Sequence, residues 1–201
     1  MTEKEYFDLL IHHLGGLPKK RTMGAKFLRG FPRYMDEKKA FVDLYDWTNI
    51  KSAIDIGTGI GILLWLLMQK GIKVQATEII EEIKNPKGTY KICCSAIGID
   101  LIPLYIHNNQ PMNFPGHFDI LVANRTVFDR ECLKPGEKFN WDFFLGDAFK
   151  YVNYVFIKTN SGSKTGPGFG TWLQKYTFKI NGNWHIKLSK KEYQEHFRDY
   201  K

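Results

Sequence analysis

Three glycines and one glutamate have a spacing that suits a ligand-binding loop. Gly57, Gly59 and Gly61 alternate in the segment "IGTGIG", and Glu78 follows 17 positions after the last of them. Glycines between a strand and a helix let the backbone approach a ligand closely and present N–H groups at the helix N-terminus. A carboxylate at the end of the next strand can accept hydrogen bonds from both hydroxyls of a ribose. The spacing therefore predicts a site for a ribose-containing ligand.

Short apolar runs that alternate with helical stretches are expected to position these residues. The predicted strands are 52–57, 73–79, 101–107, 118–124 and 154–160, and the predicted helices are 60–70, 89–98 and 141–151. Such alternation is typical of a parallel sheet that is covered on both faces. Two alternating runs flank Asn181-Gly182 and predict a β-hairpin at the end of the chain. The sequence thus predicts an α/β fold with a doubly wound, mostly parallel sheet and a C-terminal antiparallel β-hairpin.

The N-terminal part of the chain lies outside this pattern. Residues 3–14 carry an apolar stripe at helical spacing, and Gly15-Gly16 are expected to end that helix. Residues 19–33 hold six Lys or Arg residues among apolar ones, and a further helix is predicted over 36–47. We expect one domain, 1–201, in which 1–35 form a helix with a basic lid or substrate segment and 36–201 form the α/β core. The basic segment suits a lid or a nucleic-acid strand equally.

Composition limits the classes of protein to consider. The chain has 201 residues, 43% of them hydrophobic, and a formal charge of +8, which favours an anionic partner. Its three cysteines form neither a disulfide framework nor a paired metal spacing, so we expect buried thiols in a reducing compartment and no metal site. The first residues lack the apolar core of a signal peptide, and the longest apolar run, 60–68, is too short to cross a bilayer. We expect a cytoplasmic protein without a membrane role.

The glycine loop departs from the dinucleotide-binding fingerprint. It reads G-x-G-x-G, with Ile62 where a third glycine of G-x-G-x-x-G would stand. Together with Asp55, the segment "IDIGTGIG" closely resembles the first motif of class I S-adenosylmethionine-dependent methyltransferases, and Glu78 matches the acid of that family's second strand. The resemblance covers roughly residues 36–190. It implies a Rossmann-like fold that ends in an antiparallel hairpin, S-adenosyl-L-methionine as the cofactor and methyl transfer as the activity.

The resemblance also implies roles for individual residues. The three glycines would line the methionine moiety, and Thr58 belongs to the same cofactor-binding loop. Asp55 would hold the loop or the amino group of the ligand, and Glu78 would bind the ribose. The adenine would lie against the end of the third strand, where Asn108 could hydrogen-bond its amino group. Many members of the family carry an aspartate there, and Asn113 or Met112 are equal candidates for this contact.

The end of the fourth strand, "FDILVANRTVF", is where the family presents residues beside the methyl group. Adenine-amino and glutamine methyltransferases carry an Asn/Asp-Pro-Pro-aromatic motif here. Asn124 matches its first position, but Arg125 and Thr126 replace both prolines and Phe128 is displaced by one. Asn124 would orient the acceptor, or it simply ends a strand. Arg125 would pair with an anionic acceptor or with the substrate's carboxylate, or it is one more basic residue.

The sequence leaves the acceptor open. We expect a methyltransferase that acts on an unidentified small molecule, or on an exposed group of RNA, DNA or protein. His107 and His117 are candidates for a general base if the acceptor is protonated, and Asp119 is expected to be structural. A catalytically inactive, methyltransferase-like module that binds nucleic acid is an alternative. An aminopropyl transferase is less consistent with the sequence, because it would need acidic residues along a polyamine groove, whereas the segments expected beside the ligand crevice are basic.

Overall fold

The computed structural model describes residues 1–16, 23–79, 88–124, 133, 137–159 and 168–198. The chain forms two compact units. The first unit comprises Met1–Asn49 and Gly57–Leu104, and the second comprises Ile50–Ile56 and Tyr105–Lys201. The expectation of a single domain over 1–201 stays a prediction.

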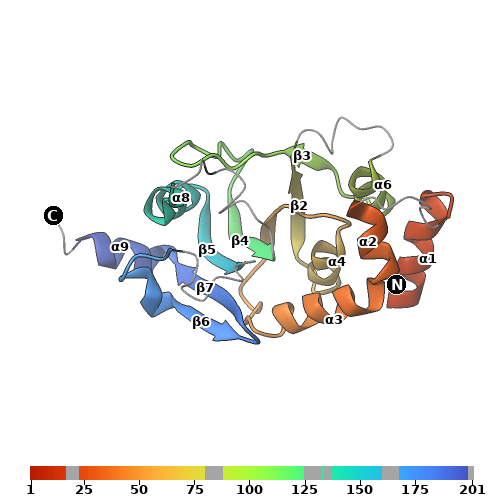
Figure 1. Ribbon diagram of the computed structural model, residues 1–201, viewed down its shortest axis with the longest axis horizontal. Coiled ribbons are helices and arrows are strands. Elements are labelled where there is room, and N and C mark those ends of the chain that lie inside the picture. The colour runs from red at the N-terminus through yellow and green to blue at the C-terminus, as the bar shows by residue number, and fades with distance from the viewer. Residues whose placement is uncertain (17–22, 80–87, 125–132, 134–136, 160–167, 199–201) are drawn as a thin grey trace. The chain divides into compact units, whose positions relative to one another are not determined.

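The first unit contains the N-terminal helices and two parallel strands (Figure 1). Its helices are α1 (Glu3–His13), α2 (Met23–Arg29), α3 (Phe31–Val42), α4 (Ile62–Gln69) and α6 (Thr89–Ala96). Its strands are β2 (Lys73–Glu78) and β3 (Leu101–Pro103), paired so that Ala76 lies opposite Leu101. Helices α1 and α2 pack against α6, and α4 packs against both α3 and β2.

The second unit contains the other five strands. They are β1 (Ser52–Ile56), β4 (Phe118–Asn124), β5 (Val152–Lys158), β6 (Thr177–Ile180) and β7 (Asn183–Ser189). β4 pairs in parallel with β1 and β5, whereas β7 pairs antiparallel with β5 and β6. The helices of this unit are α8 (Trp141–Ala148), the 3-10 helix η1 (Leu173–Tyr176) and α9 (Lys190–Arg198).

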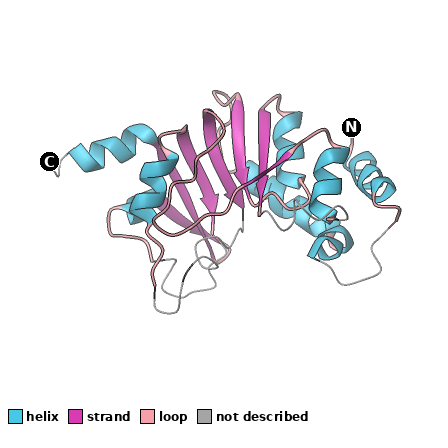
Figure 2. Ribbon diagram, turned by 90° about the horizontal axis from the view of Figure 1, so that it is seen from above, coloured by secondary structure: helices cyan, strands magenta, loops and turns pink. Residues whose placement is uncertain are grey.

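The strands, magenta in Figure 2, pair in the order β3-β2-β1-β4-β5-β7-β6. The order reverses between β1 and β4, which is the point where open α/β sheets bind their ligands, beyond the carboxyl ends of the strands. Asn181 and Gly182 connect β6 to β7 with φ of 48° and 79°. Positive φ at both positions matches a type I′ turn, which suits the twist of a hairpin. The predicted Rossmann-like, doubly wound sheet with a C-terminal antiparallel hairpin is confirmed.

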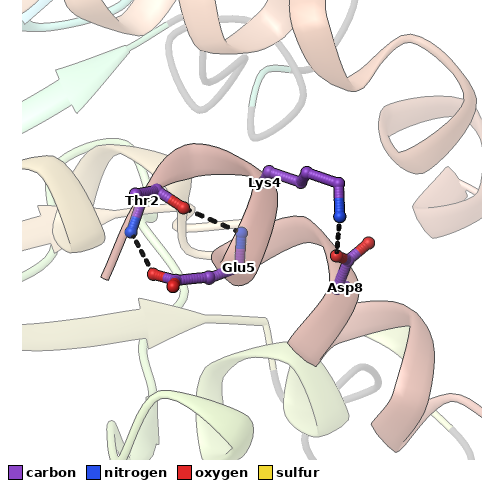
Figure 3. A network of polar contacts seen from close by, with 4 residues as sticks. All are labelled: Thr2, Lys4, Glu5 and Asp8. Atoms are coloured by element: carbon purple, nitrogen blue, oxygen red, sulfur yellow. Dashed lines mark hydrogen bonds and ion pairs between the residues drawn. The ribbon is translucent and has the colours of Figure 1, made fainter.

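Helix α1 begins with a complete capping box (Figure 3). The Glu5 N–H donates to the Thr2 hydroxyl at 3.2 Å, and the Thr2 N–H donates to the Glu5 carboxylate at 2.6 Å. The helix buries Tyr6 and Leu10 and ends before Gly15 and Gly16, which both have positive φ, as the sequence predicted. Capping satisfies N–H groups that have no partner within the helix.

The hydrophobic core of the first unit accounts for the apolar residues of the basic N-terminal segment. Leu28 and Phe31 are buried in the same cluster as Tyr6, and Phe27 packs against it. Lys26, Arg29 and Arg33 are exposed. The described rings of segment 19–33 therefore pack inside the protein, and only its charges face the solvent. Residues 19–22 of that segment lie outside the described residues.

Several predicted boundaries differ from the structure. Helix α3 begins and ends five residues before the predicted helix 36–47. Pro32 is tolerated in its first turn, where no helical N–H is needed, and the Trp47 indole N–H donates to the Val42 carbonyl at 2.7 Å where the helix ends. β3 is shorter than the predicted strand 101–107, and β5 lies two residues earlier than 154–160. Helices α2 and α9 were not predicted.

Two residues tie the beginnings of β1 and β4 together. The Asp119 carboxylate accepts from the N–H groups of Lys51 and Ser52 at 2.7 and 2.9 Å, and from the Ser52 hydroxyl at 3.2 Å. The Ser52 hydroxyl also accepts from the Asp119 N–H at 2.9 Å. The structural role predicted for Asp119 is confirmed.

Cys93 and Cys94 are free, buried thiols in α6, as expected. Burial raises the pKa of the Cys93 thiol to about 12, so this thiol is protonated at neutral pH. Cys132 lies outside the described residues. Among the helices of the described part of the chain, none is both long enough and apolar enough to cross a membrane.

Candidate functional site

The glycine loop that follows β1 has a backbone that favours glycine at three positions. Gly57, Gly59 and Gly61 have φ of 67°, 63° and 86°. A Cβ added to Gly61 would lie 3.2 Å from Cδ1 of Ile97, so the protein itself fills that side. A Cβ added to Gly59 would meet no atom of the described residues within 4 Å. The loop is therefore packed against protein at Gly61 and open at Gly59.

Thr58 joins the loop to the end of β2. Its N–H donates to the Thr77 carbonyl at 3.0 Å, and its hydroxyl accepts from the Thr77 N–H at 3.3 Å. Both threonines are buried. Within the loop, the Gly61 N–H donates to the Thr58 carbonyl at 3.3 Å. These bonds fix the loop beside the strand that ends in Glu78.

Glu78 lies against the glycine loop. One of its carboxylate oxygens, Oε2, accepts from the Gly59 N–H at 3.1 Å, and Oε1 accepts from the Ile79 N–H at 3.1 Å. Its side chain is largely buried, with 9% of the residue exposed. The structure thus brings together, through the backbone of Gly59, the glycine loop and the acid that the sequence singled out.

Two residues that the sequence analysis did not assign to the site also contact the backbone of the glycine loop. The Tyr6 hydroxyl of α1 donates to the Ile60 carbonyl at 3.0 Å. The Cys94 thiol of α6 donates to the Gly59 carbonyl at 3.6 Å. The sequence showed Tyr6 as one member of an apolar stripe and Cys94 as a buried thiol, and neither pattern indicates a hydrogen bond 54 or 35 residues away.

In the second unit, three polar residues lie in one row across the sheet. Asn124 at the end of β4 pairs with Lys158 of β5, and Lys158 pairs with His185 of β7. Side chains of directly paired residues project from the same face of a sheet. Asn124 and His185 are buried, with 6% and 2% of each residue exposed. Sequence reasoning found Asn124 but not His185, since the pairing of β7 with β5 is needed to see this row.

His185 is neutral at physiological pH. Burial, and to a smaller extent the positive charge of Lys158, lower its pKa from 6.5 to about 4. Its ring stacks on Phe178, with 5.1 Å between the ring centroids. The row therefore combines a neutral imidazole, a cation and an amide.

Comparison with known proteins identifies the architecture. No protein-family model and no curated protein sequence matches the chain. A solved mutant of MtNAS in complex with S-adenosylmethionine is 13% identical, with a TM-score of 0.50 over 93% of this chain and 75% of that one. The ribosomal protein L11 methylase from Lactobacillus delbrueckii subsp. bulgaricus is 16% identical, with a TM-score of 0.50 over 77% of each chain.

The chain has the fold of class I S-adenosylmethionine-dependent methyltransferases. Identities this low show the fold alone. Within the methyltransferase fold, Asp55 occupies the predicted place on β1, two residues before the glycine loop, and is buried. The cofactor roles assigned to Asp55, to the glycine loop and to Glu78 stay predictions.

Asn108 holds a neighbouring segment of the methyltransferase fold. Its amide N–H donates to the Lys138 carbonyl at 3.1 Å, and its amide oxygen accepts from the Asn140 N–H at 2.9 Å. Asn140 is the N-cap of α8, and its side-chain oxygen accepts from the Phe143 N–H. Asn108 therefore supports the start of α8, and its predicted contact with adenine stays a prediction.

Some of the remaining predicted site residues lie in the described part of the chain and others lie outside it. Arg125, Thr126 and Phe128 lie outside the described residues. His107 and His117 lie in the second unit, where their rings contact Tyr105 and Tyr151 respectively. Within the described part of the chain, no three His, Cys, Asp or Glu side chains are arranged to hold a metal ion. The expectation that there is no metal stays a prediction.

Proposed function

We propose that this chain binds S-adenosyl-L-methionine and transfers its methyl group to an acceptor. The observation that carries the proposal is the hydrogen bond between the Glu78 carboxylate and the N–H of Gly59, a glycine whose Cβ position meets no described atom within 4 Å. It places a carboxylate beside a backbone that a ligand can approach closely. This combination suits a ligand that has both a ribose and a polar chain.

The donor would be held from two sides. On one side, the Glu78 carboxylate, which accepts from the N–H groups of Gly59 and Ile79, would bind the ribose. A ribose diol can donate both of its hydroxyls to such a group. The methionine moiety would lie along the open loop at Gly59, near the N-terminus of α4, where backbone N–H groups favour a carboxylate.

Methyl transfer needs little chemistry from the protein beyond alignment. The acceptor's lone pair attacks the methyl carbon, and the sulfonium leaves as a neutral thioether. Holding the donor and the acceptor in line can supply much of the acceleration. We propose that Asn124 orients the acceptor through its amide, and that a protonated acceptor loses its proton to water.

A small-molecule acceptor is the preferred form of the proposal. The described rings of the basic N-terminal segment pack in the core, which supports a role other than stacking on nucleic-acid bases. Its exposed cations, Lys26, Arg29 and Arg33, are compatible with an anionic metabolite or with a phosphate backbone. Methylation of an exposed group on RNA, DNA or protein is the alternative that remains.

The donor is tested by calorimetric titration of the wild type and of Glu78→Gln with S-adenosylmethionine and S-adenosylhomocysteine. Hydrogen bonds to charged groups contribute about 1.5–3 kcal/mol each, so the substitution should weaken binding by roughly tenfold or more. Asp8→Asn is the matched control, because it also converts an acid to an amide, on the exposed face of α1. A folded wild type that binds neither ligand would contradict the proposal.

The acceptor is tested with methyl-labelled S-adenosylmethionine and cell extract separated into small molecules, nucleic acid and protein. We expect the label in the small-molecule fraction, and a large loss of labelling with Asn124→Ala. Label in nucleic acid or protein would replace the preferred acceptor with the alternative. A wild type that binds the donor but labels no fraction would indicate a donor-binding module without turnover.

A further inference from the structure

Helices α1 and α6 each donate one side-chain hydrogen bond to a backbone carbonyl of the glycine loop. The Tyr6 hydroxyl donates to the Ile60 carbonyl at 3.0 Å and the Cys94 thiol donates to the Gly59 carbonyl at 3.6 Å. Both side chains are fully buried. A Cβ added to Gly61 would lie 3.5 Å from Cys94 Sγ and from the Tyr6 hydroxyl oxygen. These two donors therefore occupy the filled side of the loop, and two consecutive carbonyls face them.

The direction of those carbonyls determines the direction of the N–H groups. In a trans peptide, the C=O of one residue and the N–H of the next point to opposite sides. With the Gly59 carbonyl turned toward Cys94, the Ile60 N–H is turned away from α6. With the Ile60 carbonyl turned toward Tyr6, the Gly61 N–H is turned away from α1, and it donates to the Thr58 carbonyl at 3.3 Å. The two buried donors thus set which way the N–H groups of the loop face.

We infer that Tyr6 and Cys94 are positioning residues of the glycine loop, and that helix α1 is coupled through Tyr6 to the binding of the donor. The inference rests on the proposed function for the identity of the ligand. It adds that the donor site depends on an N-terminal helix far from the loop in sequence, through a hydroxyl that contacts the loop's backbone.

The ring and the hydroxyl of Tyr6 have separate roles. The ring stacks on Trp65 with 4.8 Å between centroids and packs against Phe31 at 5.7 Å, so its position is set by the core. Burial raises the pKa of the Tyr6 hydroxyl well above its ordinary value, which keeps it protonated and able to donate. Tyr6→Phe would therefore keep the packing of α1 and remove the bond to the loop.

Coupling of this kind acts in both directions. If the bond from α1 favours the loop conformation that binds the donor, the donor must favour the docked position of α1 by the same factor. Saturating S-adenosylhomocysteine should therefore slow amide hydrogen exchange in α1, around Tyr6 and Leu10, as well as in the loop. In Tyr6→Phe the protection of α1 by the ligand should be lost, because the link is gone.

The test compares Tyr6→Phe with Leu10→Val, a buried position on the same helix. In Tyr6→Phe without ligand, we expect the amides of Thr58, Gly59 and Gly61 to exchange roughly fivefold faster or more, and S-adenosylhomocysteine to bind roughly fivefold more weakly or worse. Leu10→Val should lower the melting temperature and leave both the exchange of the loop amides and the affinity for S-adenosylhomocysteine unchanged. A purely structural role for Tyr6 would change the melting temperature alone.

Cys94 offers a rescue experiment. Cys94→Ala removes the donor to the Gly59 carbonyl, whereas Cys94→Ser keeps one in nearly the same volume. We expect faster exchange at Gly59 and Ile60 in Cys94→Ala and protection close to the wild type in Cys94→Ser. Equal exchange in the two variants would remove Cys94 from the inference.

The remaining outcomes separate the inference from the proposed function. Unchanged loop exchange in Tyr6→Phe would overturn the inference, whatever the ligand does. Faster loop exchange with unchanged affinity for S-adenosylhomocysteine would also overturn it, because the donor would not use the order that Tyr6 imposes. If the wild type binds no donor while Tyr6→Phe loosens the loop, the proposed function fails and the positioning of the loop by Tyr6 is supported.

Discussion

Gly59 and Gly61 share a backbone conformation but differ in their surroundings. Both have positive φ, a region that costs other residues about 1–3 kcal/mol. At Gly61 an added Cβ would also press on Ile97, whereas at Gly59 it would enter space in which no described atom lies within 4 Å. Gly61 is therefore required by packing within the protein. Gly59 lies where we place the ligand.

This difference predicts that alanine at Gly61 mainly lowers stability, whereas alanine at Gly59 mainly weakens ligand binding. Gly61→Ala should lower the free energy of unfolding by about 2–4 kcal/mol, from backbone strain and overpacking together. Gly59→Ala should lower it by only about 1 kcal/mol but should weaken S-adenosylhomocysteine binding more strongly. Urea unfolding and calorimetry measure the two quantities. If the two variants lost the same stability and bound S-adenosylhomocysteine with the same affinity, this assignment of the two glycines would be contradicted.

His185 makes the stability of the folded chain depend on pH in a defined window. Its pKa is about 4 in the folded chain and 6.5 when it is unperturbed, because burial and Lys158 disfavour the charged ring. Below pH 6.5 the unfolded chain binds a proton at this residue while the folded chain does not. The contribution of His185 to stability is therefore complete above pH 6.5 and is lost as the pH falls to 4.

We expect the free energy of unfolding to fall between pH 7.5 and pH 5 by up to about 2 kcal/mol on account of His185. In His185→Phe, which keeps an aromatic ring beside Phe178, this part of the decrease should be absent. Urea unfolding of both proteins at the two pH values gives the difference. Parallel decreases in the wild type and the variant would show that other groups cause the pH dependence.

At the scale of single elements, the capping box makes α1 sensitive to Thr2. Thr2→Ala removes the side-chain acceptor for the Glu5 N–H and should lower the free energy of unfolding by about 1 kcal/mol. Lys4→Ala is the control, because it breaks the ion pair with Asp8, which is exposed to solvent and therefore contributes little to stability. Thermal unfolding compares the two. A larger effect of Lys4→Ala than of Thr2→Ala would contradict the role of the cap.

The pairing of β1 with β4 depends on Asp119. Asp119→Ala leaves the N–H groups of Lys51 and Ser52 without their carboxylate acceptor and should lower the free energy of unfolding by about 1–3 kcal/mol. Because β1 leads directly into the glycine loop, loop exchange should rise as well. Urea unfolding with hydrogen exchange measures both effects. A variant as stable as the wild type would show that strand pairing alone fixes β1.

The sequence predicted the elements that rest on local patterns. Apolar runs predicted β1, β2 and β4 nearly to the residue, and Asn181-Gly182 predicted the hairpin, because a type I′ turn tolerates few residue pairs. The end of α3 was predicted five residues too late, because Trp47 lies beyond the helix and its side chain returns to Val42. Such a contact has no signal in the residue pattern and is seen only in the folded chain.

At the scale of the whole molecule, the candidate site was predictable where its residues are close in sequence. The glycines and Glu78 belong to one strand-helix-strand unit, whose geometry is common to parallel sheets. Tyr6 and His185 come from elements far along the chain, and only the packing of α1 and the pairing of β7 with β5 bring them to the loop and to the Asn124 row respectively. No local residue pattern encodes such long-range contacts, so Tyr6 and His185 were not found from the sequence.

The central claim is that the glycine loop with Glu78 binds the donor, and it is tested most directly by two-dimensional amide NMR. At 23.4 kDa the chain is small enough for resolved amide signals during a titration with S-adenosylhomocysteine. We predict that the signals of Gly59, Ile60 and Ile79 shift together with one dissociation constant, and that Glu78→Gln raises this constant. A titration in which the signals of residues 57–61 and 79 remain in place would contradict the account.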